Sequence, residues 1–503
     1  MKKNKAQQKK YGIFFLMVCM IIAGLLVQCG GKTRRANRSG QPDILLITID
    51  TLRPDRLSAY GYKGHETRNI DRLAKEGAAF DNAYCDVNWT TPSMASTLTG
   101  TYAYKHGLRS MYTRLPDSAV TIAEILKNAG YSTAAVIGAF PLDSVYGLDQ
   151  GFDVYNDTFS EPIYTGARTP PQDIPSTWGE SIKERKQLFF KKIVNKSRRS
   201  DQEVTDTAVN LLKELSKNQK PFFLWVHYFG PHDVPDLRLT RLDNWKIHAA
   251  GYAGKVLNTD KAVGDLLSAL DSYGLSRETL VIFHADHGES LGEHGFVGHG
   301  VYLYEDNLRI PLLMRWPGKI PGGRRYHQLI GNVDLSPTLL DAAGIKGKKP
   351  GYMDGKSLLP VIRSGISLHP SLYFETYLCA HDIHAEIVDT GKGQKIKVGI
   401  RSYGILEKPW KYIVTGFFPL FDAAETTVGK DIQERVERFE LFDLYNDPGE
   451  LRSMVGTGTG ASKVQELGRL LSRHTELDQT GIKNRMKLSR DQLDKLKSLG
   501  YVK

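Results

Sequence analysis

The chain has 503 residues, of which 41% are hydrophobic and 24% charged, and its formal net charge is +11. This hydrophobic share suffices for a large core and excludes a disordered chain. The basic residues are spread out rather than gathered in a stripe, which argues against nucleic acid as a partner and favours an anionic membrane surface or a small anionic substrate. The four cysteines are too few for a disulfide framework or a thiolate metal site.

The N-terminus has the layout of an export signal. Lysines within the first ten residues precede an apolar run over residues 12–27, which is shorter than the roughly 20 residues of a spanning helix. Leu26–Gly30 resembles a bacterial lipobox with Cys29 as the lipidated residue, although Gln28 replaces the usual small residue. The alternative is an uncleaved membrane anchor within residues 1–29. Either arrangement, with a polar tether at residues 30–41, predicts a protein of the cell envelope, held at a membrane with its folded domain on the periplasmic or extracellular face.

From Pro42 onward, apolar runs typical of strands alternate with segments of helical spacing. Strands are predicted at residues 44–49, 133–137, 222–227 and 279–283. Helices are predicted at residues 68–76, after Pro92, and at 119–129, 202–217 and 255–273. This alternation predicts an α/β fold, with a mostly parallel sheet sandwiched by helices.

Two parts of the sequence depart from this alternation. Residues 155–200 are rich in Pro, Lys and Arg, and we interpret them as a surface insertion, either a substrate-selecting loop or a variable excursion. After about residue 365 the predicted strands become short, at 371–375, 399–402, 410–415 and 440–443, with helices at 464–474 and 489–499. The sequence thus predicts a main domain at 42–365 and a smaller region with a helical tail at 366–503.

Reactive side chains follow the predicted strands. Asp50 ends the first strand, and Asp286 and His287 follow the strand at 279–283, at the edge where open α/β sheets bind ligands. Thr90 directly precedes a predicted helix start, where free N–H groups attract anions. A nucleophile in that setting suits transfer of a phosphoryl or sulfuryl group.

Taken together, several short segments of this sequence resemble motifs of the sulfatase family, which belongs to the alkaline phosphatase superfamily. The resemblance rests on Asp50–Asp55, Thr90–Ser93 with Leu98–Gly100, Pro231–His232, Ala285–Glu289 with Gly292–Gly295, Asp334–Leu340 and Asp354–Leu358. It implies an alkaline-phosphatase-like domain followed by a small C-terminal α+β subdomain, whose signature Phe442–Pro448 resembles.

The resemblance also implies a divalent metal, with Asp50, Thr90, Asp286 and His287 as ligands. Sulfatases usually carry a second acidic ligand directly after the first, where this chain has Thr51. An imidazole at His287 favours Zn or Mn, with Ca or Mg as the alternatives.

Thr90 stands where a sulfatase carries the cysteine or serine that becomes formylglycine, and Met94 replaces the arginine of that motif. Threonine cannot form the aldehyde, so no formylglycine is expected, and Thr90 itself is predicted to be the nucleophile. Its ester must then be cleaved by water attacking phosphorus or sulfur, which inclines the expectation toward phosphate mono- or diesters over sulfate.

Further roles follow from the same resemblance. His232 and His299 are predicted to be catalytic or to contact the substrate. Substrate binding is also predicted for Lys105, His106, His227 and His294.

The predicted activity is that of an exported, metal-dependent hydrolase of sulfate or phosphate esters. Its substrate would be a small anionic ester or a sulfated or phosphorylated glycan or lipid. One alternative is a phosphotransferase that acts on a lipid or glycan. Another is a non-catalytic, glycan-binding sulfatase homologue, although a binding protein has no need of a nucleophile among metal ligands.

Overall fold

The structure is a computed structural model of the chain, and it describes residues 40–110, 113–162, 196–232, 245–345, 351–377, 386–389, 395–419 and 435–477. These described residues all belong to one compact unit. No helix within the described ranges is long and apolar enough to cross a membrane. The predicted signal, Cys29 and the helix at 489–499 lie outside the described residues.

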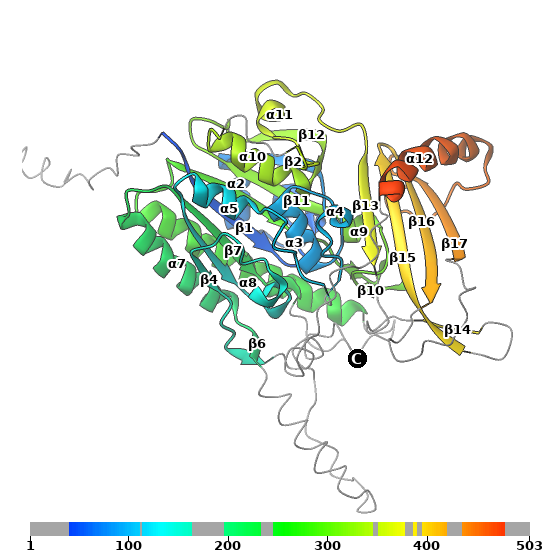
Figure 1. Cartoon of the computed structure of the whole chain (residues 1–503), viewed down its shortest axis with the longest axis horizontal. Helices are drawn as coiled ribbons and strands as arrows, with labels where there is room; N and C mark the ends of the chain where they lie inside the picture. The colour runs from blue at the N-terminus through cyan, green and yellow to red at the C-terminus, as the bar shows by residue number, and fades with distance from the viewer. Residues whose placement is uncertain are drawn as a thin grey trace, which may run out of the picture. The chain divides into compact units, whose positions relative to one another are not determined.

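A large mixed sheet forms the centre of the described part (Figure 1). Its order is β12-β2-β11-β8-β1-β7-β3-β4. The strands are β1 (Asp43–Ile49), β2 (Ala78–Tyr84), β3 (Ser132–Ile137), β4 (Val154–Asn156), β7 (Phe222–Tyr228), β8 (Thr279–Ala285), β11 (Arg309–Arg315) and β12 (Arg324–Gly331). Strands β8, β1, β7, β3 and β4 run parallel, and β11 is antiparallel to both of its neighbours. The predicted mostly parallel sheet is confirmed.

Helices pack against this sheet in two groups. Helices α2 (Arg68–Glu76) and α7 (Asp201–Lys217) both contact the long helix α8 (Trp245–Ser272). Helices α3 (Thr90–Thr99), α5 (Ile122–Asn128) and α10 (Leu335–Ala342) contact one another. Because every residue of β1, β7 and β8 is buried, both faces of the central strands are covered, as a parallel sheet requires.

Local sequence signals explain where these helices begin. Thr121 with Glu124, and Ser200 with Glu203, form capping boxes in which each side chain bonds the backbone N–H of the other residue. Helix α5 therefore begins at Ile122 rather than at the expected 119. Helix α3 begins at Thr90, so Pro92 lies in its first turn. Proline is tolerated there because the N–H that it lacks would have no partner within the helix.

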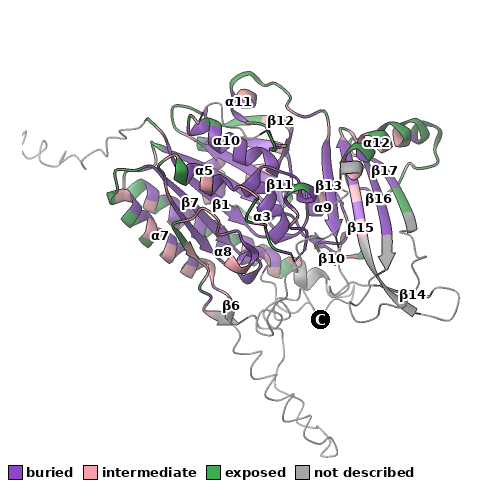
Figure 2. Ribbon diagram, viewed as in Figure 1, coloured by how far each residue is buried: buried purple, intermediate pink, exposed green. Residues whose placement is uncertain are grey.

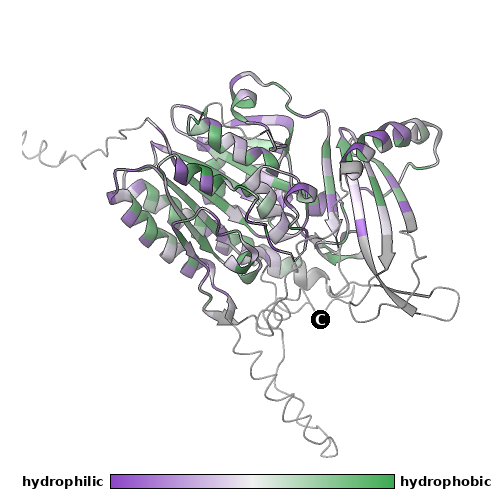
Figure 3. Cartoon of the chain, in the orientation of Figure 1, coloured by the Kyte–Doolittle hydropathy of each residue, from purple (hydrophilic) through white to green (hydrophobic). Residues whose placement is uncertain are grey.

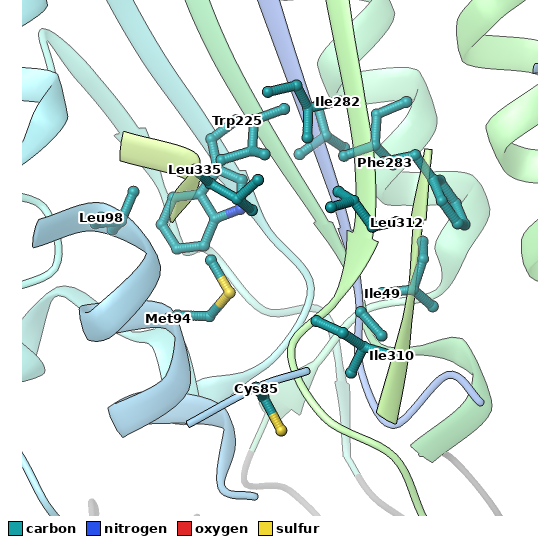
Figure 4. Packing of buried hydrophobic residues seen from close by; sticks show 14 of the residues in the cluster. Ile49, Cys85, Met94, Leu98, Trp225, Ile282, Phe283, Ile310, Leu312 and Leu335 are labelled. Atoms are coloured by element: carbon teal, nitrogen blue, oxygen red, sulfur yellow. The ribbon is translucent and has the colours of Figure 1, made fainter. Parts of the chain in front are cut away.

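The core lies between the sheet and its helices. Figure 2 shows the central strands buried almost throughout, and Figure 3 shows that the same strands are hydrophobic. Met94 of α3 joins Ile49, Ile282 and Leu312 from three neighbouring strands in one cluster (Figure 4). All ten residues of α3 are buried, so the helix that carries Thr90 is fixed by packing on every side.

A second, antiparallel sheet follows in the chain. It contains β13 (Leu372–Tyr377), β14 (Glu386–Asp389), β15 (Lys395–Glu407), β16 (Trp410–Pro419) and β17 (Arg435–Asp443), and α12 (Gly458–Leu477) packs on β15 and β16. This is the small C-terminal sheet with a helix that the sequence predicted. Its buried Lys411 forms ion pairs with Glu305 and Glu450, at 3.2 and 2.5 Å.

The surface insertion is described only at its two ends. Short strands β5 (Glu161–Pro162) and β6 (Lys196–Arg198) pair there, and residues 163–195 lie outside the described ranges. The domain boundary at residue 365 and the role of this insertion stay predictions.

Candidate active site

Three parallel strands bring the predicted ligands together. Ile49 of β1 lies beside Ala285 of β8 in the sheet register, so the residues that follow, Asp50 and Asp286, emerge side by side. On the other side of β1, Thr48 lies beside His227 of β7. One edge of the sheet therefore gathers two carboxylates and an imidazole from distant parts of the sequence.

Asp50, His227 and Asp286 form a cluster suited to a cation. One ligand atom from each lies within 4.8 Å of the others, and all three residues are fully buried. Asp50 Oδ1, His227 Nε2 and Asp286 Oδ2 have no hydrogen-bond partner. Buried polar atoms are rarely left unpaired, so three such atoms at one place indicate a ligand that satisfies them together.

The other atoms of these side chains are held by the backbone and by a hydroxyl. Asp286 Oδ1 accepts hydrogen bonds from the N–H groups of Thr51 and His287, at 3.1 and 2.7 Å. His227 Nδ1 lies 2.8 Å from Thr48 Oγ1. Thr51 has a φ of +54°, a strained conformation for a β-branched residue, and it thereby aims its N–H at the carboxylate. Such supporting bonds orient the ligand atoms toward the cluster.

The electrostatics of the cluster also favour a cation. Burial, and then the neighbouring charge of Asp286, raises the pKa of Asp50 well above its usual value. Burial lowers the pKa of His227 to about 4, so this imidazole is neutral at pH 7 and keeps a lone pair for a metal. Two buried carboxylates beside a neutral imidazole nitrogen are a donor set that divalent metals bind.

Thr90 faces this cluster from the start of α3. Its Oγ1 lies 3.5 Å from Asp50 Oδ2 and 3.2 Å from His287 Nε2. His287 Nδ1 lies 2.9 Å from the carbonyl of Gly288, an acceptor only, so Nδ1 carries the proton and Nε2 presents a lone pair to the site. Ser93 Oγ donates to the carbonyl of Asp286 at 2.6 Å and ties α3 to the strand end. The four predicted metal ligands therefore converge.

His299 and His232 extend the site away from the cluster. The ring centroids of His299 and His287 lie 4.4 Å apart, and those of His299 and His232 lie 5.1 Å apart. His299 Nδ1 lies 2.8 Å from Glu289 Oε2, a pairing that sets the tautomer of the ring. Burial, and then the neighbouring His299, lowers the pKa of His232 well below its usual value, so without substrate this ring is neutral at pH 7.

The structure gives three of the predicted substrate-binding residues other surroundings. Lys105 forms an ion pair with Asp354. His106 is buried against Ser96, with its Nε2 3.0 Å from Ser96 Oγ, and burial lowers the pKa of His106 to about 3. His294 stacks on Tyr304 with ring centroids 3.9 Å apart. These contacts do not test substrate binding, so the roles assigned to Lys105, His106 and His294 stay predictions.

Two features of the site were not foreseen. His227 lies in the ligand cluster, whereas the sequence predicted that it contacts the substrate. Its position at the end of a strand, like that of Asp50, is the sequence feature that could have indicated a ligand. Arg53 was overlooked, although it supports the loop from Glu289 to His299. Its Nη1 donates to the carbonyl of Glu289 at 2.8 Å and to Glu293 at 2.9 Å.

Gly230 shapes the turn that carries His232. The N–H of Gly230 donates to Asp201 Oδ1 at 3.1 Å, and Asp201 Oδ2 accepts a 2.5 Å bond from Thr259 Oγ1. A Cβ at Gly230 would lie 2.1 Å from Thr259 Oγ1 and 2.2 Å from Asp201 Oδ2. These two side chains therefore fill the space beside Gly230.

Gly230→Ala should therefore lower the free energy of unfolding by about 1–3 kcal/mol, as overpacking of a filled site does. Urea unfolding would measure the change. Gly254→Ala is the matched control, because this exposed position in α8 has no heavy atom within 4 Å of an added Cβ. The control should gain about 0.5–1 kcal/mol from better helix propensity. Equal stability of the two variants would contradict the packing described at Gly230.

The fold and the buried carboxylate–histidine site define an alkaline-phosphatase-like enzyme. Residues 42–345 match the family model described as Sulfatase, and the chain belongs to the sulfatase family, whose members hydrolyse sulfate esters. The family and the fold expected from the sequence are confirmed.

Curated relatives are similar over most of their length. The chain is 24% identical to an N-acetylglucosamine-6-O-sulfatase of Bacteroides thetaiotaomicron, over 89% of this chain and 88% of the relative. It is 28% identical to arylsulfatase A of Homo sapiens, over 87% of this chain and 88% of the relative.

Solved structures share the fold. A protein in complex with its substrate D-glucosamine-2-N,6-O-disulfate superimposes with a TM-score of 0.64 at 22% identity, over 87% of this chain and 98% of the other. A phosphonate monoester hydrolase of Agrobacterium radiobacter gives a TM-score of 0.62 at 18% identity, over 87% of this chain and 96% of the other.

Proposed function

We propose that the protein is an exported, metal-dependent hydrolase of sulfate or phosphate esters that uses Thr90 as its nucleophile. The observation that carries the proposal is the position of Thr90 Oγ1, 3.2 Å from His287 Nε2 and 3.5 Å from Asp50 Oδ2, beside a buried cluster with three unpaired ligand atoms. A nucleophilic hydroxyl needs a base or a cation beside it, and this one adjoins an imidazole nitrogen and the residues that would hold a cation.

The residues present fit a divalent cation. Asp50, Asp286 and His227 would hold it, with His287 Nε2 and Thr90 Oγ1 as further ligands. When bound, it would lower the pKa of the threonine hydroxyl and neutralise charge on the non-bridging oxygens. Both carboxylates are oriented by backbone N–H groups or by neighbouring side chains before any ligand arrives, so little reorganisation is needed.

The reaction then proceeds by two displacements. Thr90 Oγ1 passes its proton to Asp50 Oδ2 and attacks phosphorus or sulfur, the bond to the substrate oxygen breaks, and that oxygen takes a proton from His299 or His232. Water next attacks the same atom and gives a proton to that imidazole, while the Thr90 oxygen leaves and takes its own proton back from Asp50. His232 is neutral without substrate, but a bound anionic ester raises the pKa of a nearby imidazole and restores its capacity as an acid.

Two observations bear on the ester. The curated relatives are named as sulfatases of N-acetylglucosamine and N-acetylgalactosamine, which supports a sulfated amino-sugar glycan. Thr90 supports a phosphate ester instead. A formylglycine hydrate can expel sulfate by collapsing to its aldehyde, whereas threonine has one hydroxyl and must be released by direct attack of water. Sulfate esters of a glycan are therefore the first candidate, and phosphate esters the second.

A substrate panel tests the proposal. Purified protein with measured metal content would be assayed on aryl sulfate, aryl phosphate, a phosphodiester and 6-O-sulfated N-acetylglucosamine. Turnover of one ester class that is lost on chelation and restored by Zn or Mn supports the proposal. Turnover that is indifferent to chelation, or absent for every ester with metal bound, contradicts it. Transfer to an added alcohol in preference to water would favour the phosphotransferase.

The proposed location has its own test. Cys29→Ser should abolish incorporation of a radiolabelled fatty acid into the protein, because the thiol is the acceptor of the lipid. Cys19→Ser removes the other thiol of the leader and should leave labelling unchanged. Labelled Cys29→Ser protein would refute the lipobox, and an unlabelled but membrane-bound wild type would favour the uncleaved anchor.

A further inference from the structure

His299 lies in a loop that is flanked by glycines. The loop follows the short hairpin of β9 (Ser290–Leu291) and β10 (Val297–Gly298). The φ values beside the histidine are +120° at Gly298 and +84° at Gly300, in the region that glycine adopts most readily. Because glycine adds conformational freedom to a chain, the direction of the His299 side chain depends on contacts that hold the loop from outside.

Two buried side chains hold the carbonyl of Gly300. This oxygen accepts hydrogen bonds from Thr376 Oγ1 at 2.6 Å and from Trp89 Nε1 at 3.1 Å, which uses both of its lone pairs. The loop also rests on the indole ring, because a Cβ at Gly300 would lie 2.1 Å from Trp89 Cε2. We call Thr376 and Trp89 the Gly300 clamp.

The two residues of the Gly300 clamp come from distant parts of the sequence. Trp89 directly precedes Thr90, whereas Thr376 belongs to β13 of the C-terminal sheet. Strand β13 also reaches the segment before Thr90, because the N–H of Glu375 donates to the carbonyl of Asp86 at 2.8 Å. The C-terminal sheet therefore contacts both the approach to the proposed nucleophile and the loop that the clamp holds.

The ring of His299 is held at a second point. Its Nδ1 lies 2.8 Å from Glu289 Oε2, and the ring meets that of Trp89 edge-on with centroids 5.4 Å apart. The Gly300 clamp thus fixes the backbone beside the histidine, while Glu289 and Trp89 fix the ring itself. Together these contacts keep the imidazole beside His287, with ring centroids 4.4 Å apart, at the edge of the proposed metal cluster.

We propose that the Gly300 clamp positions His299 for the transfer of a proton to the leaving oxygen. Thr376 and Trp89 are positioning residues, since they act on the reaction through the loop. The inference rests on the proposed function, because His299 is one of the two imidazoles assigned to that step. It gives the C-terminal sheet a part in the reaction, because a shift of about 1 Å in a reacting group can cost about 100-fold in rate.

The test uses two esters that differ in their need for an acid, nitrophenyl sulfate and 6-O-sulfated N-acetylglucosamine, or the matching phosphates if those are turned over instead. A nitrophenolate leaves as a stable anion, whereas a sugar alcohol needs a proton as it leaves. Thr376→Val removes the hydroxyl at a strand position that suits valine. It should lower kcat about 10- to 100-fold on the sugar ester and less than about twofold on the nitrophenyl ester, with KM unchanged on both. Trp89→Phe keeps an aromatic ring, removes the N–H and should act in the same direction.

Thr415→Val is the matched control. Thr376, Ser402 and Thr415 lie in one row across the C-terminal sheet, and the Thr415 hydroxyl lies 3.0 Å from Ser402 Oγ. This variant should leave kcat on both esters unchanged. His299→Gln should show the same loss confined to the sugar ester. Adding Thr376→Val to His299→Gln should then change kcat less than about twofold, since both substitutions act through one imidazole.

Three outcomes overturn the inference: equal losses on both esters in Thr376→Val or His299→Gln, no loss on either ester, or a full further loss in the double variant. If wild type turns over neither ester, the proposed function fails, and hydrogen exchange of the peptide that spans residues 296–304 decides on the Gly300 clamp. Faster exchange there in Thr376→Val than in Thr415→Val supports the clamp, and equal exchange rejects it.

Discussion

Thr90→Ala should abolish turnover, with kcat lower by at least about 10⁴-fold, the scale on which loss of a nucleophile acts in other hydrolases. The reason is geometric. Thr90 Oγ1 is the hydroxyl that faces both Asp50 and His287, and the neighbouring Thr91 hydroxyl donates to the carbonyl of Pro141 instead. Thr90 is the first residue of α3 and not its cap, so the alanine variant should fold. Single-turnover assays on the preferred ester would measure the loss.

Metal content distinguishes a lost nucleophile from a lost site. Thr90→Ala should keep part of its metal, because Asp50, His227 and Asp286 remain. Thr97→Ala makes the same change at a buried position of the same helix, where the hydroxyl has no hydrogen-bond partner, and should leave kcat within about twofold of wild type. A Thr90→Ala enzyme with more than a tenth of wild-type activity would refute the assignment. Thr90→Cys should not restore formylglycine chemistry, because Met94 replaces the arginine of that motif.

Much of the framework of this site was predictable from local sequence. The run from Ile44 to Ile49 is apolar without interruption, which marks a strand buried on both faces, and the polar residue that ends it must then lie at the sheet edge. The same argument placed Asp286 and His287. The family motifs added the order of the segments, which apolar periodicity alone does not supply.

The other features of the site depend on which residues become neighbours when the strands pair. A linear sequence does not specify this pairing. His227 joins the ligand cluster because β7 pairs with β1, a partner 179 residues away in the chain. Lys105 was predicted to bind substrate because it follows α3, and its ion pair with Asp354, which lies in a distant loop, was not visible in the sequence.

Asp286→Asn should lose metal and activity together. The substitution keeps the Oδ1 acceptor for the N–H groups of Thr51 and His287, so the backbone at the strand end keeps its hydrogen bonds. It replaces the unpaired Oδ2 by a neutral donor and removes one of the two buried carboxylates. Metal affinity should fall more than about 100-fold, since even the loss of a residue that only supports a ligand costs 10- to 100-fold.

Thermal unfolding with and without metal gives a readout that is independent of turnover. Wild type should be stabilised by about 4 kcal/mol at a metal concentration 1,000 times its Kd, whereas Asp286→Asn should be indifferent to metal. Without metal the variant should be at least as stable as wild type, because the repulsion by Asp286, which adds to burial in raising the pKa of Asp50, has been removed. Asp265→Asn makes the same chemical change at an exposed ion pair on α8 and should keep the full metal response. Full metal content in Asp286→Asn, measured by mass spectrometry of the dialysed protein, would show that the cation is held elsewhere.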